Sequence, residues 1–171
     1  LKNGIYYFDF TASGLAYRPI EDEMAKMLQT YANTHSISSS NAYKTAQIYE
    51  DSRSELKSLL GLDDSFYLFA CGNGATGAIK KFQEILGIYA PPALKKRYAL
   101  KADENSPLVV FGPYEHHSNE ISFRQALCEV ERIRLDKNGG IDFNHLEQIL
   151  RINAGREIIA TFSVASNVTG V

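Results

Sequence analysis

A glycine-rich loop that joins an apolar run to a helical pattern constrains the fold of this chain more than any other stretch. The apolar run, residues 66–70, has the length and the aromatic composition of a buried strand. It leads into a loop that contains Gly72, Gly74 and Gly77, and residues 78–86 then carry apolar side chains at helical spacing. The sequence therefore predicts a strand, a sharp loop and a helix in succession.

The start of such a helix is a favoured place for a phosphate group. Several backbone N–H groups in the first turn lack intrahelical acceptors, and the positive end of the helix dipole lies there. Thr76 adds a hydroxyl donor at the same point. The Gly-x-Gly-x-x-Gly string alone fits a tight turn that binds nothing equally well, and the loop lacks the Lys-Ser/Thr ending of a P-loop, which argues against nucleotide hydrolysis.

The composition narrows the class of protein. A chain of 171 residues with 44% hydrophobic side chains is long and apolar enough for one ordinary domain with a core. A net charge of −2 with scattered basic residues provides no field for nucleic acid or for an acidic membrane surface, so neither partner is expected. The sequence has no apolar run of about 18 residues, and its start does not resemble a signal peptide, so a cytoplasmic location is expected.

A metal site is disfavoured. Cys71 and Cys128 lie far apart without a Cys-x-x-Cys pair, so we expect two small buried apolar side chains rather than a disulfide or zinc ligands. The adjacent His116 and His117 are suited to metal binding, to acid–base chemistry or to stacking on an aromatic ligand. Only Glu115 stands beside them as a further ligand, so metal binding is disfavoured, and a surface or helix-capping pair without a functional role remains an alternative.

The apolar periodicity predicts helices and strands that alternate along the chain. Helices are expected over residues 20–31, 41–60, 78–86, 120–127 and 142–153. Strands are expected over residues 66–70, 108–111, 129–135 and 157–164, and a charged surface excursion over residues 93–105. Uninterrupted apolar strands that alternate with helices predict an α/β fold with a mainly parallel sheet.

Three polar clusters follow predicted strands, at residues 72–77, 115–119 and 166–170. In sheets of this kind, ligands bind at the carboxyl ends of the strands, where the connecting loops converge. The three clusters are therefore expected to form one site.

Short segments in a fixed order carry a resemblance along nearly the whole chain. They are residues 7–13 (Tyr-Phe-Asp-Phe-Thr-Ala-Ser), 31–36 (Tyr-Ala-Asn-Thr-His-Ser), 49–53 (Tyr-Glu-Asp-Ser-Arg), 74–76 (Gly-Ala-Thr), 115–119 (Glu-His-His-Ser-Asn) and 166–170 (Ser-Asn-Val-Thr-Gly). The set resembles the class V aminotransferase and cysteine desulfurase family of pyridoxal-phosphate enzymes, which have the fold called type I. The resemblance implies part of the large domain of that fold, a mainly parallel sheet with flanking helices that is incomplete in this chain.

The resemblance also implies the residues that hold the cofactor, pyridoxal 5′-phosphate. Ala75 and Thr76 would bind its phosphate. His116 would lie flat on its pyridine ring and assist proton transfer at the reacting carbon, as the catalytic residue of this chain. Asn167 would donate a hydrogen bond to its phenolic oxygen or to the substrate carboxylate.

The resemblance further implies a substrate side and a division of the chain. Ala12, His35 and Asn167 would lie on the substrate side of the site. Residues 1–60 would be the N-terminal segment and helices that lead into the large domain, and residues 61–171 would be the first part of the cofactor-binding domain. The parent enzyme would act on an amino acid, as a homodimer.

Two departures from the family pattern limit what is expected of this chain. The family has Glu after the phosphate-binding Thr, whereas Gly77 stands here, and this change is expected to loosen the start of the helix. The cofactor-pairing Asp and the Schiff-base lysine of the family come after the equivalent of Val171, so an inactive N-terminal fragment with unpaired strand edges is expected. Transaminase, desulfurase and lyase activities of the parent stay open. A non-catalytic phosphate-binding or interaction module and a nucleotide-binding domain remain alternatives.

Overall fold

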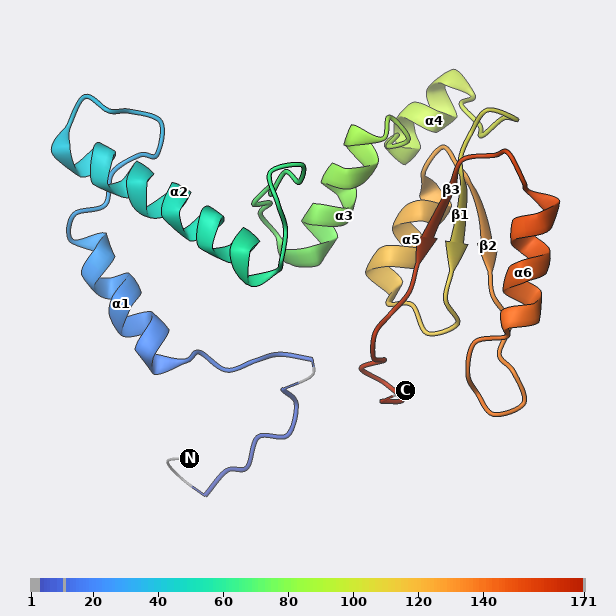
Figure 1. Cartoon of the computed structure of the whole chain (residues 1–171), viewed down its shortest axis with the longest axis horizontal. Helices are drawn as coiled ribbons and strands as arrows, with labels where there is room; N and C mark the ends of the chain where they lie inside the picture. The colour runs from blue at the N-terminus through green and yellow to red at the C-terminus, as the bar shows by residue number, and fades with distance from the viewer. Residues whose placement is uncertain (1–3, 11, 171) are drawn as a thin grey trace. The chain divides into compact units, whose positions relative to one another are not determined.

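The computed structural model describes residues 4–10 and 12–170. It divides into two compact units, Leu1–Phe69 and Ala70–Val171 (Figure 1). The domain boundary expected after residue 60 stays a prediction. No helix in the described ranges is both long enough and apolar enough to span a membrane.

Two helices form the regular part of the first unit. They are α1, Arg18–Leu28, and α2, Ser40–Leu59 (Figure 1). The Ser39 side chain begins α2 by accepting a hydrogen bond from the Ala42 N–H group (3.1 Å). Gly61, with a φ of 68°, follows the end of α2, where a left-handed backbone favours glycine. Both predicted helices of this unit are confirmed.

A polar contact fastens the loop between these helices onto α2. The Thr45 hydroxyl accepts a hydrogen bond from the Ala32 N–H group (3.1 Å) and donates one to the Asn41 carbonyl (2.9 Å). Of the described residues in the first unit, only Ala42 and Thr45 are buried. This unit is therefore held by local contacts rather than by a large apolar core.

The strand predicted over residues 66–70 is wrong. These residues are irregular, and Phe66, Tyr67 and Phe69 are 52%, 84% and 64% exposed. An apolar run becomes a strand only when a neighbouring strand satisfies its backbone groups, and the three described strands pair only with one another. The aromatic composition predicted a buried strand, but the composition of a segment does not show whether a neighbouring strand is present to pair with it.

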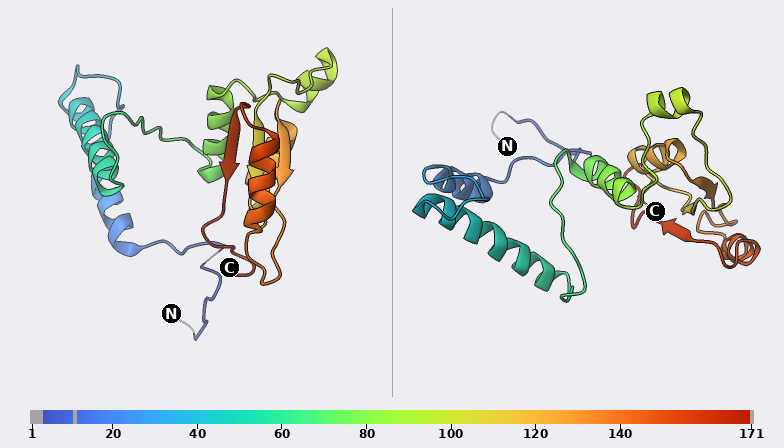
Figure 2. Two further views of the ribbon diagram at one scale, coloured as in Figure 1. Left: turned by 45° about the vertical axis from the view of Figure 1, so that its right-hand side comes forward. Right: turned by 90° about the horizontal axis from the view of Figure 1, so that it is seen from above.

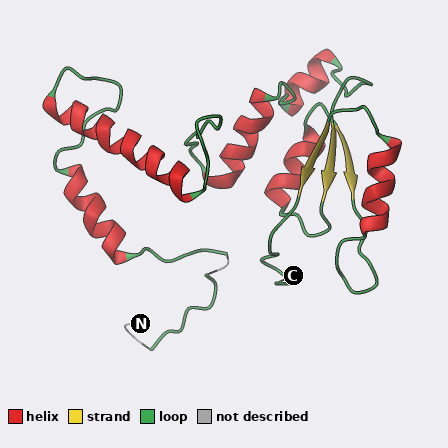
Figure 3. Ribbon diagram, viewed as in Figure 1, coloured by secondary structure: helices red, strands yellow, loops and turns green. Residues whose placement is uncertain are grey.

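A three-stranded parallel sheet forms the centre of the second unit. Its strands are β1 (Leu108–Phe111), β2 (Glu129–Arg132) and β3 (Ile158–Thr161), in the order β2-β1-β3 (Figure 3). The register aligns the first residues of all three strands. The predicted α/β fold with a parallel sheet is confirmed, and β2 and β3 end earlier than the sequence suggested.

Two helices flank this sheet, and a third packs against one of those two. They are α3 (Gly74–Ile85), α5 (His117–Gln125) and α6 (Phe143–Ile152), which confirm the helices predicted in these places. Their starts differ from the predicted ones: α3 begins directly in the glycine loop, and α5 begins inside the histidine cluster. The first turns of α3 and α5 therefore contain residues of the polar clusters that were predicted to form the site.

The core of the second unit lies on both faces of β1, which is buried along its whole length. Alternate residues of β1 face opposite sides, so α5 covers one face and α6 the other (Figure 2). The first face buries Ile88, Val109, Phe111, Phe123 and Ala126. The second face buries Leu108, Val110, Ile133 and Ile149. Because β1 is packed on both faces, the position of its carboxyl end is well defined.

The charged stretch predicted to be a surface excursion over residues 93–105 is largely exposed, and its first part is helical. Helix α4 spans Pro92–Tyr98. The Lys95 ammonium group donates hydrogen bonds to the carbonyls of Gln125 (2.9 Å) and Ala126 (3.2 Å). Because these carbonyls end α5 and lack intrahelical partners, a lysine from a charged segment becomes a structural residue here.

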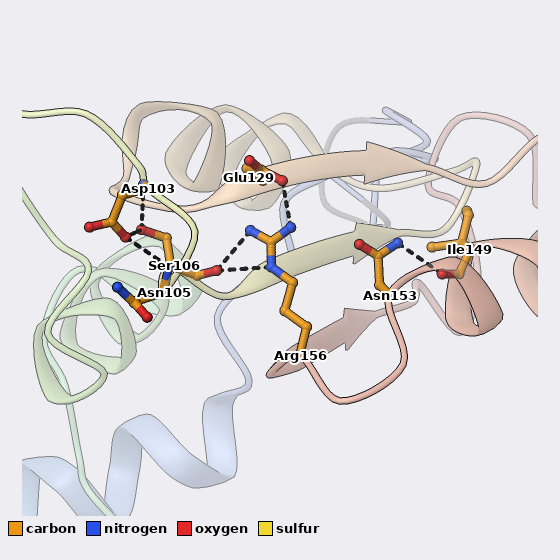
Figure 4. Close-up of polar contacts among 7 residues, drawn as sticks. All are labelled: Asp103, Asn105, Ser106, Glu129, Ile149, Asn153 and Arg156. Atoms are coloured by element: carbon orange, nitrogen blue, oxygen red, sulfur yellow. Dashed lines mark hydrogen bonds and ion pairs between the residues drawn. The ribbon is translucent and has the colours of Figure 1, made fainter.

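An arginine joins the amino ends of the three strands. Arg156 precedes β3 and donates two hydrogen bonds to the Ser106 carbonyl, from Nε (3.0 Å) and Nη2 (2.8 Å) (Figure 4). Its Nη1 donates to Glu129 Oε2 at the start of β2 (2.6 Å). Ser106 stands just before β1, so all three strands are tied at one edge, opposite the carboxyl ends where a ligand site is expected.

Candidate functional site

A cavity of about 340 Å³ lies at the carboxyl ends of β1 and β3. One wall is the segment that follows β1, and the other is the segment that follows β3. The lining residues are Tyr114, Glu115, His116, His117, Ser166, Asn167, Val168 and Thr169. The structure thus brings together two of the three polar clusters, and with them the predicted site residues His116 and Asn167.

His116 stands where β1 gives way to α5, and its ring caps that helix. Its Nδ1 accepts a hydrogen bond from the Ser118 N–H group (3.2 Å) and lies 2.7 Å from the Ser118 hydroxyl. A nitrogen that accepts carries no proton, so the neutral ring carries its proton on Nε2. His116 is exposed, and its ring is tilted by 42° to that of His117 at a centroid distance of 6.4 Å.

A side-chain amide joins the segment after β1 to the end of β3. Asn119 Nδ2 donates hydrogen bonds to Glu115 Oε2 (2.7 Å) and to Thr161 Oγ1 (2.6 Å). The other oxygen of the carboxylate, Glu115 Oε1, is buried without a hydrogen-bond partner among the described residues. The link holds the end of β3, from which the second wall continues, against the first turn of α5.

The loop after β3 is shaped by one serine. Ser166 Oγ accepts hydrogen bonds from the N–H groups of Val168 and Thr169 (3.2 Å each), and the Ser166 carbonyl accepts one from the Gly170 N–H group (2.9 Å). Such a turn holds the backbone on both sides of Asn167. The exposed Asn167 amide is therefore presented by a folded loop and not by an extended tail.

The glycine loop makes a tight start to α3. Asn73 and Gly74 both have left-handed backbones, with φ values of 65° and 63°. A Cβ atom at Gly77 would overlap the carbonyl oxygen of Gly72, so the loop folds back onto the first helical turn only because this residue is glycine. The residue that departs from the family pattern thus allows a closely packed turn, which corrects the expectation that it loosens the helix start.

The predicted phosphate-binding residues lie in this first turn. Ala75 and Thr76 are both exposed, and neither is among the residues that line the cavity. Helix α3 packs against α5, and the buried Gln83 of α3 donates a hydrogen bond to the Ser122 hydroxyl (2.9 Å). The roles given to Ala75 and Thr76 stay predictions.

The predicted substrate-side residues belong to the first unit. The Ala12 N–H group donates to the Asp9 carbonyl (3.1 Å), and the His35 N–H group donates to Asn33 Oδ1 (3.1 Å). Both Ala12 and His35 are exposed. Thr11, which stands beside Ala12 in the family-like segment, lies outside the described residues. Their roles too stay predictions.

The cysteines are only partly buried, in contrast to the expectation of buried apolar side chains. Burial raises the pKa of the Cys128 thiol to about 11, against a smaller opposite effect of Lys95. Its Sγ donates a hydrogen bond to the Phe123 carbonyl (3.2 Å). Because the thiolate is the reactive form, Cys128 is not suited to be a nucleophile near neutral pH.

Two residues that shape this site were not predicted from the sequence. Thr161, in the last position of β3, anchors Asn119, and Ser118 contacts the ring of His116. Thr161 could have been found in the sequence, because it is the one hydroxyl residue at the end of an otherwise apolar strand. No sequence signal distinguished Ser118, because its contact depends on the way in which the first turn of α5 closes.

Comparisons with known proteins identify the fold and the family of this chain. No curated protein sequence matches the chain. The cysteine desulfurase CsdA from Escherichia coli has a similar structure, with 19% sequence identity and a TM-score of 0.57, and the match covers 96% of this chain and 39% of that one. This likeness identifies the fold as part of a fold-type-I domain. The sequence also matches the family Aminotransferase class-V over residues 6–171. Because that match covers nearly all of the sequence, the chain belongs to the class V aminotransferase and cysteine desulfurase family.

Proposed function

We propose that this chain is the cofactor-binding part of a pyridoxal-phosphate-dependent transferase that acts on an amino acid. The family depends on pyridoxal phosphate in general. The observation that carries the proposal is the cavity at the carboxyl ends of β1 and β3, in which His116 and Asn167 come together. Ligands bind in this place in α/β sheets, and these two residues are the ones that the family resemblance assigns to the cofactor.

The start of α3 supplies a donor set that fits a phosphate. The N–H groups of its first turn have no intrahelical acceptors, and the helix dipole adds positive potential there. Ala75 and Thr76 would hold the phosphate through these groups and the Thr76 hydroxyl, and both residues are exposed to a ligand. Gly77 supports this role, because it lets the loop close tightly before the helix.

His116 and Asn167 fit the aromatic part of the cofactor. The exposed imidazole has the flat shape that stacks on a pyridine ring, and its Nε2–H group is left available because Nδ1 is already an acceptor. Asn167 would donate from its amide to the phenolic oxygen or to the substrate carboxylate. When bound, pyridoxal phosphate withdraws electrons from the carbon that carries the substrate amino group. His116 would then hold or move a proton at that carbon.

The described cavity contains no lysine among its lining residues. We therefore propose that the 171 residues bind the cofactor without attaching it covalently and are inactive alone. The chain spans 39% of the length of CsdA, so the activity of the whole protein, as a transaminase or a desulfurase, is itself a proposal. So are its homodimeric state and its cytoplasmic location, which rest on the family resemblance and on the composition.

Cofactor binding tests this function. We expect pyridoxal phosphate to bind this chain saturably and Thr76→Val to weaken its binding about tenfold, because the hydroxyl donates to a charged group. The measurement is a titration of the visible absorbance with dialysis. Thr30→Val, which removes a hydroxyl from the other unit, is the control and leaves the affinity unchanged.

Two results would contradict the proposal. If wild type does not bind pyridoxal phosphate saturably, the assignment of the site fails. If borohydride reduction fixes the cofactor to one defined lysine of this chain, the claim of non-covalent binding fails, although the family assignment stands.

A further inference from the structure

We infer that Ser118 is the positioning residue of His116: its hydroxyl and its backbone N–H group hold the imidazole with Nδ1 as acceptor and Nε2 as the proton-bearing edge. The use of that edge in catalysis rests on the proposed function. The arrangement of the ring is a property of this chain alone and is tested without the cofactor.

The two donors of Ser118 converge on a single ring nitrogen. The N–H group lies 3.2 Å from Nδ1 of His116 and the hydroxyl oxygen lies 2.7 Å from it. A backbone N–H group cannot accept a hydrogen bond, so it fixes Nδ1 as the acceptor. The hydroxyl can then only donate to the same atom, and its shorter distance makes it the stronger of the two contacts.

The surrounding structure keeps this arrangement in place. His116 is the residue before α5, so the Ser118 N–H group belongs to the first turn and has no intrahelical acceptor. The His116 carbonyl in turn accepts hydrogen bonds from the N–H groups of Asn119 (3.0 Å) and Glu120 (3.2 Å). Ring and backbone of His116 are thus both fixed to the start of a helix that packs on the sheet, and such fixed groups are suited to precise proton transfer.

The neighbouring histidine provides an internal contrast. The ring nitrogens of His117 have no hydrogen-bond partner among the described residues, and its recorded ring contact is the tilted one with His116. Of two adjacent histidines that line the same cavity, only His116 has its tautomer set by the protein. The difference in tautomer between the two histidines can be measured.

The test is the tautomer of His116 in the ¹⁵N-histidine-labelled chain. Two-bond proton–nitrogen spectra are recorded at a pH of about 8.5, and His116→Gln identifies the signals. We expect wild type to carry its proton on Nε2. In Ser118→Ala only the backbone N–H group remains as a donor, so the Nδ1 signal moves toward that of a more weakly hydrogen-bonded acceptor, and the Nδ1–H form rises about fivefold, the factor for one net hydrogen bond.

Two further variants separate positioning from folding. Ser118→Thr keeps a hydroxyl and restores the wild-type signals. Ser122→Ala removes a hydroxyl from the same helix, one that contacts Gln83, and leaves the His116 signals unchanged. The inference is overturned if wild type shows the Nδ1–H form, or if Ser118→Ala leaves the His116 signals where they were.

These outcomes are distinct from failure of the proposed function. If the spectra agree but wild type binds no pyridoxal phosphate, Ser118 still positions His116 and the cofactor assignment is the part that fails. If the cofactor binds but the spectra disagree, the site stands and the role of Ser118 is rejected.

Discussion

At the scale of single residues, Glu120 is a buried carboxylate that two arginines neutralise. It is 5% exposed and pairs with Arg124 (2.7 Å) and with Arg132, which joins α5 to β2. Burial alone would raise the pKa of the Glu120 carboxyl, but the hydrogen bonds from the two arginines outweigh it and hold the pKa below its ordinary value. A depressed pKa means that the charged form stabilises the folded state.

The pH dependence of stability follows from this shift. The stabilisation by Glu120 is fully present above its unfolded pKa of 4.5, and it is lost as the pH falls below that value toward the folded pKa. We expect Glu120→Gln to lower the free energy of unfolding by about 2 kcal/mol at neutral pH, and by less as the pH falls below 4.5. Urea denaturation at several pH values measures the difference.

A surface pair on α6 is the matched control for this prediction. Glu147 and Arg151 have a similar distance (2.7 Å), but their side chains are 60% and 77% exposed. Glu147→Gln should change stability by no more than about 0.5 kcal/mol, because solvent screens such pairs. Equal effects of the two substitutions, or an effect of Glu120→Gln that grows in acid, would show that the buried charge is not stabilising.

At the scale of elements, the contacts of Arg156 at the amino ends of the strands stabilise the sheet. Arg156 contacts both Ser106 and Glu129, and its planar guanidinium group donates from three nitrogens at once. Lysine has one ammonium group and cannot reproduce this fork. We expect Arg156→Lys to lower the free energy of unfolding by about 1–2 kcal/mol, measured as a lower urea midpoint with an unchanged slope.

Arg151→Lys is the control for this substitution, because Arg151 lies on the exposed side of α6 and pairs only with Glu147 in the described structure. It should leave the midpoint nearly unchanged. If both substitutions had the same effect, the three-way contact of Arg156 would contribute no more than an ordinary surface charge.

The elements also differ in how far local sequence spacing predicts them. Helices α1, α2 and α6 and strand β1 follow from local apolar spacing, which the sequence displays directly. The run at residues 66–70 has equally clear spacing but is not a strand, because pairing is not a local property. Helix α4 was not predicted because its sequence is charged and has no apolar spacing, and the contact of Lys95 with the end of α5 is not visible in the sequence.

The candidate site shows the same limit. The meeting of His116 and Asn167 was predictable, because parallel strands place their carboxyl ends along one edge. The contacts of Thr161 with Asn119 and of Ser118 with His116 were not, since each depends on three-dimensional geometry rather than on spacing. Sequence thus indicates which residues gather, whereas the structure determines how they are held.

At the scale of the whole molecule, the two units differ in what stabilises them. In the first unit only two described residues, Ala42 and Thr45, are buried, and α1 contains no buried residue. In the second unit β1 is buried along its length and packs on both faces. Because burial of apolar surface supplies most of the stability of a fold, the units should open at different free energies.

Amide hydrogen exchange measures this difference directly. We expect the N–H groups of Val109 and Val110 to exchange slowest, since they open only when the whole second unit unfolds, and those of α1 to exchange by local opening at least about a hundredfold faster. Arg156→Lys should speed exchange in β1 and leave α1 unaffected, because the contacts of Arg156 lie in the second unit. Equal protection of α1 and β1, or acceleration of both by Arg156→Lys, would mean that the chain unfolds as one cooperative unit and that the candidate site depends on the first unit for its stability.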